Sequence, residues 1–216
     1  MNTLSKEQAF SRERTLLIAF LLSVWGPLAT GIAVILSHST TQLADFVRRT
    51  VELVAISTSW WMFRSLQRGE NLTPVQKARM EKIAGVTVAI ALGCSGAVIL
   101  SIALSRLYTF EPGGNVYPGL AIASLGLLVN SWFWKRFATQ TNEQYSPITD
   151  SQRRLYRAKV FVDLCVMAAL SAVAFNPVHP LTRYIDVFGS VAVAVYMLWS
   201  GVRTARLAMI NAKDTH

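Results

Sequence analysis

Two pairs of charged residues, each four positions apart, stand in otherwise apolar segments: Arg48 with Glu52, and Lys159 with Asp163. Residues i and i+4 of a helix lie on the same face, so the two members of each pair point in one direction. Ionisable side chains inside a membrane span are costly, and by default they mark an ion pathway or an internal ion pair. The two pairs therefore predict a charged site between two helices.

Asp45 and Arg49 add two charges to the first of these helices. At about 100° per residue they fall, with Arg48 and Glu52, within a sector of roughly 100°. The formal charges of these four residues and of Lys159 and Asp163 sum to zero, so the cluster can neutralise itself. Two interpretations stay open: a salt-bridge network that holds two helices together, and a site that binds a cation or transfers protons.

The composition is that of an integral membrane protein. Of the 216 residues, 52% are hydrophobic and 15% are charged, whereas soluble domains carry about 25% charged residues. Several segments approach the roughly 20 apolar residues of a membrane-spanning helix. We expect an all-α protein with six transmembrane helices, at about 15–36, 42–63, 80–107, 116–137, 154–175 and 184–207. The predicted organisation is a cytoplasmic lead (1–14), a six-helix transmembrane domain (15–207) and a short cytoplasmic tail (208–216).

The net charge of +9 could indicate nucleic-acid binding, so its distribution matters. With the N-terminus in the cytoplasm, sixteen of the 21 Lys and Arg residues fall on the cytoplasmic side, two fall outside, and three lie within the spans. This asymmetry is what the positive-inside rule demands. It predicts a multi-pass protein of the inner (plasma) membrane with both termini in the cytoplasm. The lipid bilayer is the expected partner, and nucleic acid is not.

Other chemistry finds little support in the sequence. Metalloprotease, hydrolase-elbow and P-loop patterns are absent from the sequence, so we expect neither an enzyme nor a cofactor. Cys94 and Cys165 lie in apolar spans without disulfide or metal-ligand spacing, and are expected to be small buried hydrophobic residues. Asn130 is expected to form an interhelical hydrogen bond, and Ala138–Ser151 to be the longest loop.

Three segments together resemble the transmembrane domain of the cation diffusion facilitator (cation efflux) family. Leu43 to Glu52 lies over the pattern L-A-D-x-x-H-x-x-x-D of that family's second helix. Lys159 to Asp163 falls in the frame of the fifth, A-x-x-x-H-x-x-x-D. Asp186 and the stretch Trp199-Ser200-Gly201-Val202-Arg203 are similar to the start and end of the sixth. The resemblance covers roughly residues 12–207.

The resemblance implies a secondary transporter, an antiporter that exchanges a small cation, such as a divalent metal ion, for protons. The family's four metal-ligand positions fall on Arg48, Glu52, Lys159 and Asp163. Arginine has no lone pair to offer, so the metal ligands would be Glu52 and Asp163. The expected substrate- or proton-binding residues are Glu52, Asp163 and Asp45, and the expected countercharges are Arg48, Lys159 and Arg49.

The chain stops soon after its sixth predicted helix, where the family usually continues into a soluble dimerisation domain. A homodimer would therefore form through the membrane helices. Two alternatives stay open for the function. One is a non-transporting accessory subunit with a structural charge network. The other is a transporter of a non-metal or chelated solute.

Overall fold

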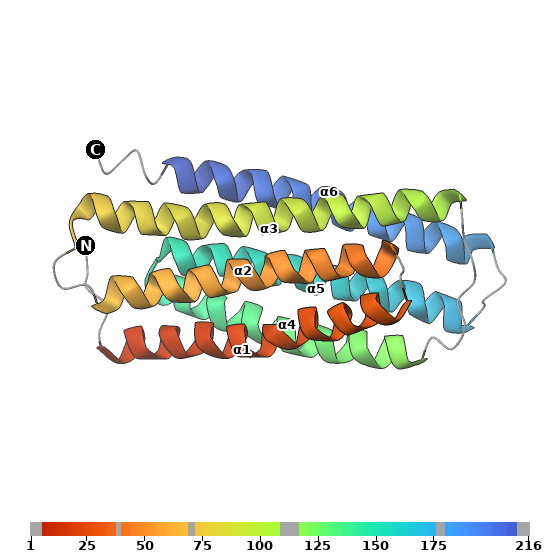
Figure 1. Cartoon of the computed structure of the whole chain (residues 1–216), viewed down its shortest axis with the longest axis horizontal. Coiled ribbons are helices and arrows are strands. Elements are labelled where there is room, and N and C mark those ends of the chain that lie inside the picture. The colour runs from red at the N-terminus through yellow and green to blue at the C-terminus, as the bar shows by residue number, and fades with distance from the viewer. Residues whose placement is uncertain (1–5, 38–39, 69–71, 109–116, 176–179, 211–216) are drawn as a thin grey trace.

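The structure is a computed structural model that describes residues 6–37, 40–68, 72–108, 117–175 and 180–210. The described chain forms six α-helices that run up and down along one long axis (Figure 1). This confirms the predicted all-α fold. The helices are α1 (Lys6–Ser37), α2 (Thr40–Arg68), α3 (Pro74–Tyr108), α4 (Tyr117–Glu143), α5 (Pro147–Phe175) and α6 (Pro180–Ile210).

The predicted loop Ala138–Ser151 is wrong, because α4 continues to Glu143 and α5 already begins at Pro147. The last carbonyl groups of a helix lack intrahelical partners, and a nearby cation can satisfy them. Arg12 of α1 does so here. Its guanidinium donates to the carbonyl oxygen of Gln140 and, at 2.8 Å, to that of Gln144.

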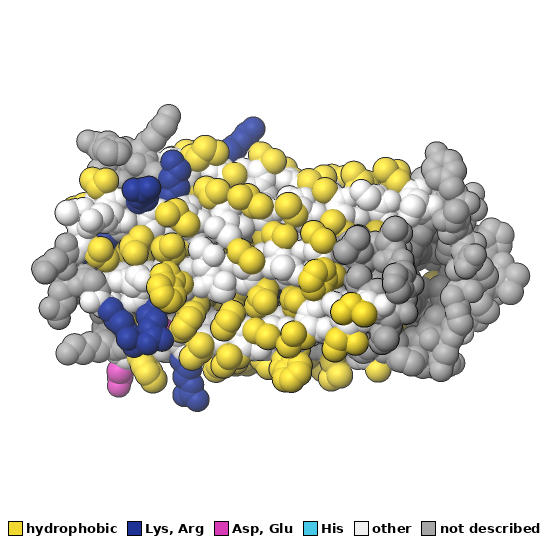
Figure 2. All heavy atoms as spheres, viewed as in Figure 1, with side chains coloured by type: hydrophobic (Ala, Val, Ile, Leu, Met, Phe, Trp, Pro, Cys, Tyr) yellow, Lys and Arg dark blue, Asp and Glu magenta, His cyan; other side chains and the backbone are white. Residues whose placement is uncertain are grey.

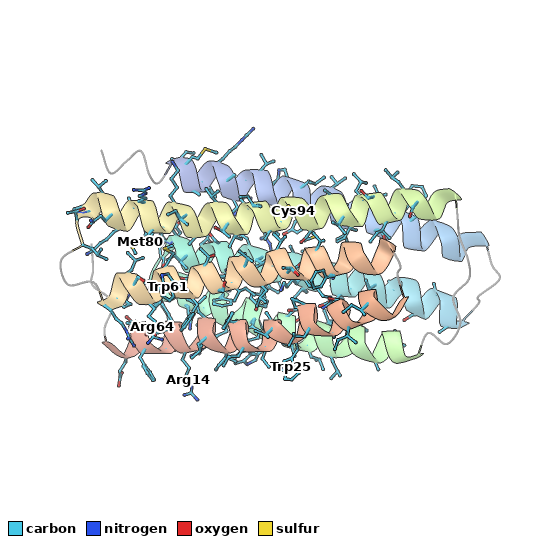
Figure 3. All side chains as sticks on the ribbon, viewed as in Figure 1. Arg14, Trp25, Trp61, Arg64, Met80 and Cys94 are labelled. Atoms are coloured by element: carbon cyan, nitrogen blue, oxygen red, sulfur yellow. The ribbon has the colours of Figure 1, made fainter. Side chains whose placement is uncertain are left out.

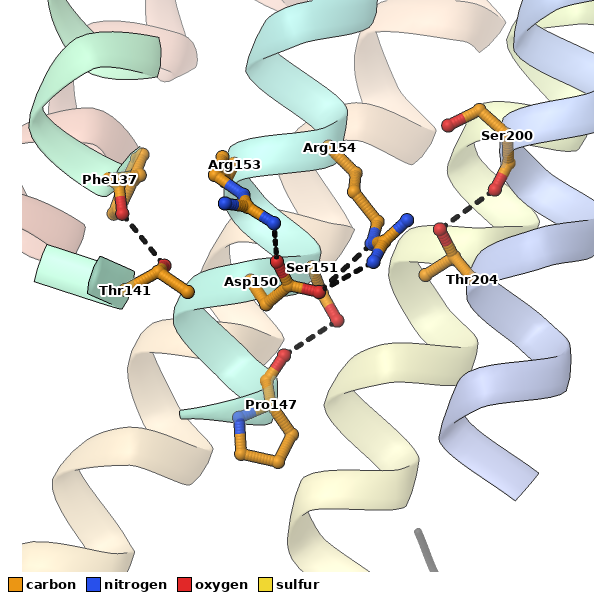
Figure 4. A network of polar contacts seen from close by, with 9 residues as sticks. All are labelled: Phe137, Thr141, Pro147, Asp150, Ser151, Arg153, Arg154, Ser200 and Thr204. Carbon is orange, nitrogen blue, oxygen red and sulfur yellow. Dashed lines mark hydrogen bonds and ion pairs between the residues drawn. The ribbon is translucent and has the colours of Figure 1, made fainter. Parts of the chain in front are cut away.

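Local chemistry also explains the early start of α5. Proline suits the first position of a helix because its missing N–H would have no partner there. Pro147 takes that position. Asp150 lies in the first turn, where a carboxylate is favoured, and it pairs with Arg153 and, at 2.9 Å, with Arg154 (Figure 4).

The helices pack unevenly. α3 lies along α6, α4 along α5 and α1 along α2, whereas α2 and α5 approach each other at few positions. Small residues allow the close approach of α3 and α6. A Cβ added at Gly201 would lie 3.1 Å from the carbonyl oxygen of Ala89, and one added at Gly96 would lie 3.0 Å from that of Ala194.

The outer surface of the bundle carries large apolar side chains (Figure 2). Trp25, for example, is 71% exposed (Figure 3), and Phe188 is 69% exposed. By length and composition, three stretches of the described chain could cross a membrane: Glu7–Ile32, Pro74–Ser105 and Val187–Ile210. Cys94 is exposed and Cys165 is half-buried, so the expectation that both are buried is wrong.

One end of the bundle is basic. α1 begins and α6 ends at the same end, and Lys and Arg side chains gather there (Figures 1 and 2). We call it the basic end. Arg64 illustrates how these cations are held: its guanidinium lies 5.3 Å from the centre of the Trp60 ring, and it pairs with Glu13 at 3.7 Å. Figure 3 shows Arg14 and Arg64 near this end.

Candidate ion-binding site

Glu52 is the centre of a charged cluster that joins three helices. Its side chain lies in the core, with 6% of the residue exposed. Lys159 of α5 approaches one carboxylate oxygen at 3.0 Å (Nζ to Oε2), and Arg48 of α2 approaches the other at 3.5 Å (Nη1 to Oε1). The hydroxyl of Ser95, on α3, donates to Oε1 at 3.2 Å. Glu52 is therefore a carboxylate held by two cations and a hydroxyl group.

Asp163 lies on the same face of α5 as Lys159 but has different partners. Its Oδ2 accepts a hydrogen bond of 2.7 Å from the amide nitrogen of Asn130, on α4. This confirms the predicted interhelical role of Asn130. Gly126, one turn earlier on α4, lies beside the carboxylate, since a Cβ there would be in van der Waals contact with Oδ1 at 3.4 Å. Among the described side chains, no cation lies within ion-pairing distance of Asp163, although the charges of Lys159, Arg48 and Glu52 act on it.

The remaining predicted residues are placed differently. The side chain of Arg49 points to α1, where its Cδ and Nη1 would lie 3.4 Å from a Cβ added at Gly26. Asp45 belongs to α2, but its side chain lies outside the described ones. The structure therefore brings Arg48, Glu52 and Lys159 together, places Asp163 within electrostatic reach, and directs Arg49 to another helix.

The ammonium group of Lys159 lies against an aromatic ring. Its Nζ lies 5.1 Å from the centre of the Tyr156 ring, which is within the range of a cation–π interaction. Tyr156 packs in turn against Phe133 and Phe137, with ring centres 4.9 Å and 5.4 Å away. These rings are buried, so the ammonium group sits at the border between the charged cluster and the apolar core.

The donor set decides which ions the cluster could hold. No group of three or more His, Cys, Asp or Glu side chains is placed to bind a metal ion within the described ranges. The available donors are the carboxylates of Glu52 and Asp163, the Ser95 hydroxyl and the Asn130 amide. All of these are oxygen donors, which suit hard cations, whereas zinc sites in proteins favour Cys and His alongside carboxylates.

Sequence reasoning did not identify Ser95, nor two polar residues further along the same interface, Ser59 and Gln152. The Gln152 amide donates to the Ser59 hydroxyl at 2.8 Å, across from α5 to α2. A signal was present in the sequence: Ser59 follows Glu52 by seven residues, and Gln152 precedes Lys159 by seven. Two helical turns separate such residues, so in an antiparallel pair they meet again on the same faces.

The fold and the site together define a helical membrane bundle with a buried ion cluster between its second and fifth helices. The model of the cation efflux transmembrane domain matches residues 16–209, which is most of the chain. The chain belongs to this family, as the resemblance implied. No curated protein matches the chain. Membership makes it a multi-pass membrane protein of a transporter family and supports cation transport as its general function.

Proposed function

We propose that the protein is a proton-coupled secondary transporter of a small cation, with its site between α2 and α5. The observation that carries the proposal is the 3.0 Å contact between Lys159 and Glu52, at two of the positions where the family resemblance puts metal ligands. The transporter would lie in the inner (plasma) membrane with both termini in the cytoplasm. A homodimer through the membrane helices stays a prediction.

The ion pair provides a coupling step. The ammonium group of Lys159 already pairs with the Glu52 carboxylate. A transported cation therefore binds this carboxylate only by displacing the ammonium group. Arg48 keeps its charge, because a guanidinium is not deprotonated in proteins. Lysine can release its proton when it is buried without a counter-ion. Entry of a cation with loss of a proton leaves fewer uncompensated charges in a low-dielectric site than entry of the cation alone, which favours exchange.

Asp163 supplies the second carboxylate. Its hydrogen-bond partner Asn130 is neutral. A transported cation can therefore bind the Asp163 carboxylate without first displacing another cation. Together with Glu52 and Ser95, Asp163 presents oxygen donors, which favour hard divalent ions such as Mn²⁺ and Mg²⁺ over Zn²⁺. Glu52 and Asp163 thus carry the cation, and Arg48 and Lys159 are the built-in countercharges.

The rival function is that of an accessory subunit in which the same ion pair only holds α2 against α5. Reconstitution separates the two. Wild-type protein in liposomes with an internal pH dye is exposed to gradients of Mn²⁺, Mg²⁺, Zn²⁺ or Na⁺. The proposal expects proton movement driven by at least one of these ions, and its loss in the double variant Glu52→Gln/Lys159→Met, in which both charges are removed together.

Lys135→Met, a substitution at an exposed lysine, is the control and should keep the flux. Silence of the wild type with all four ions would favour the accessory subunit.

The proposed orientation has its own test. Ser146 lies between α4 and α5 at the basic end. In a background without the native cysteines, Ser146→Cys should resist an impermeant thiol reagent added to intact cells and react once the membrane is opened. Ready labelling in intact cells would show that the protein has the opposite orientation.

A further inference from the structure

A second polar layer lies beside the ion cluster, on the side of the basic end. Ser59 and Gln152 occupy the same faces of α2 and α5 as Glu52 and Lys159, seven residues further along each helix. The pair is joined by the 2.8 Å hydrogen bond from Gln152 to Ser59. The α2–α5 interface therefore repeats its pattern: a charged pair, then a neutral polar pair about two helical turns away.

Gln152 is fully buried, yet half of its amide group has no partner among the described residues. The amide nitrogen also faces the carbonyl oxygen of Ala55, at 3.4 Å, which fixes the nitrogen on that side. The carbonyl oxygen Oε1 then points away and has no hydrogen-bond partner among the described residues. A buried oxygen of this kind requires a donor or a cation, because leaving it unpaired costs free energy.

More buried polar atoms without a described hydrogen-bond partner lie closer to the basic end. Buried polar atoms without a described partner occur on Thr149, one turn from Gln152, and on Gln140 and Arg12, which meet near the end of α4. Among the described residues, the buried polar side chains of α2 and α3 begin at Glu52 and Ser95, and no further ones lie beyond these two toward the far end. Among the described residues, the buried polar side chains therefore gather toward the basic end.

Apolar side chains separate the two polar layers. Ile56 and Leu155 lie between them on α2 and α5, and both are fully buried. A hydrated ion could not pass these side chains as the structure has them. The Ser59–Gln152 layer lies on the basic-end side of these two side chains, and the Glu52–Lys159 layer lies beyond them.

We propose that Ser59 and Gln152 form a hydrated station on the route by which a cation reaches Glu52 from the basic end. The Gln152 carbonyl and the Ser59 hydroxyl supply oxygen ligands, and water supplies the rest. Ile56 and Leu155 form the barrier between this station and the charged cluster. The inference rests on the proposed transport function for its purpose, but the access of water that it requires can be measured without transport.

Cysteine accessibility tests the station in the full-length chain. The background carries Cys94→Ser and Cys165→Ser, and Ser59→Cys is treated in membrane vesicles of either orientation with MTSET, a cationic, membrane-impermeant thiol reagent. The control is Ala84→Cys, a small, fully buried position on α3 in the same half of the bundle. Gln152→Cys reports on the same layer if Ser59→Cys fails to fold.

We expect the cysteine of this layer to react at least about ten-fold faster than the control, and only when MTSET is added on the side of the basic end, since thiol reactivity follows access to water. A rate no greater than that of Ala84→Cys would overturn the station, and so would faster reaction from the opposite side. If labelling follows the expected pattern while no ion drives proton flux, the transport function fails and the hydrated layer stands.

Discussion

Two helix interfaces of this bundle use different kinds of residue. α3 and α6 lie against each other through glycine: a Cβ added at Gly201 or Gly96 would lie only 3.1 Å or 3.0 Å from a backbone carbonyl oxygen of the partner helix. α2 and α5 approach at few positions, and long side chains such as Lys159, Glu52 and Gln152 reach across between them. Close packing stabilises the first interface, and an ion pair and a hydrogen bond stabilise the second.

The difference indicates which part of the molecule can change. Close-packed surfaces lose contacts as soon as they separate, so α3 and α6 should move as a unit. An interface bridged by ion pairs can exchange one partner for another, provided that a new cation replaces the one that leaves. If the protein alternates between two states, the α2–α5 interface is where the exchange should occur.

The largest expected effect comes from removing the central carboxylate. Glu52→Gln removes the carboxylate that pairs with the buried ammonium group of Lys159 and that Arg48 also contacts, which should lower the free energy of unfolding by about 3–5 kcal/mol. Thermal or denaturant unfolding in detergent measures it. Lys159→Met combined with Glu52→Gln should recover part of the loss, since the two groups are partners. Simple additivity of the two single effects would show that the 3.0 Å contact carries no coupling.

The next prediction converts the charged interface into a metal site. Wild-type protein should not bind zinc tightly here, because Arg48 and Lys159 present cations where ligand lone pairs are required. Arg48→His with Lys159→Asp supplies an imidazole and a third carboxylate beside Glu52 and Asp163. Calorimetry on chelator-stripped protein in detergent should show at least about a ten-fold gain in zinc affinity, or roughly 1.4 kcal/mol. Micromolar zinc binding by the wild type that is lost in Glu52→Ala would refute the prediction.

A smaller effect tests the glycine interface. Gly201→Ala puts a methyl group 3.1 Å from the carbonyl oxygen of Ala89, and we expect a loss of about 1 kcal/mol after the better helix propensity of alanine is counted. Gly93→Ala is the matched control, since a Cβ there meets nothing within 4 Å. It should be neutral or slightly stabilising. Equal effects of the two variants on the unfolding midpoint would remove the distinction between the interfaces.

The smallest effect should come from Asn130→Ala. Hydrogen bonds between membrane helices contribute only about 0.6 kcal/mol on average, so stability should change little. Asp163 loses its neutral donor, however, and a cation that binds there should do so with altered affinity. Calorimetry with Mn²⁺ measures this. A loss of stability as large as that of Glu52→Gln would mean that Asp163 and Glu52 have the same structural role.

The sequence was enough to predict the six helices and the faces that Arg48 shares with Glu52 and Lys159 shares with Asp163, because both depend on local periodicity. It could not show how a charged sector divides between neighbouring helices. A sector of roughly 100° is wide enough to face two partners, and Arg49 at its edge turns to Gly26 of α1 while Glu52 faces α5. Ser95 and Ser59 were missed for a related reason: a lone serine gains its role only from the helix opposite.

The loop prediction failed for a physical reason of the same kind. The polar residues of 138–151 read as a connection between spans, but α4 and α5 extend through most of it. A contact from a distant part of the chain stabilises the end of α4, where the Arg12 guanidinium donates to the carbonyl groups of Gln140 and Gln144. Such a contact depends on tertiary packing, which local composition does not reveal.

In the proposed transport step, a cation replaces the Lys159 ammonium group at Glu52 and a proton leaves as it does so. Counting protons on binding tests it directly, by calorimetry with Mn²⁺ in buffers of different ionisation enthalpy, on purified protein in detergent. We expect release of about one proton per bound ion by the wild type and no release by Lys159→Met. Binding without proton release by the wild type, or unchanged release by Lys159→Met, would contradict it.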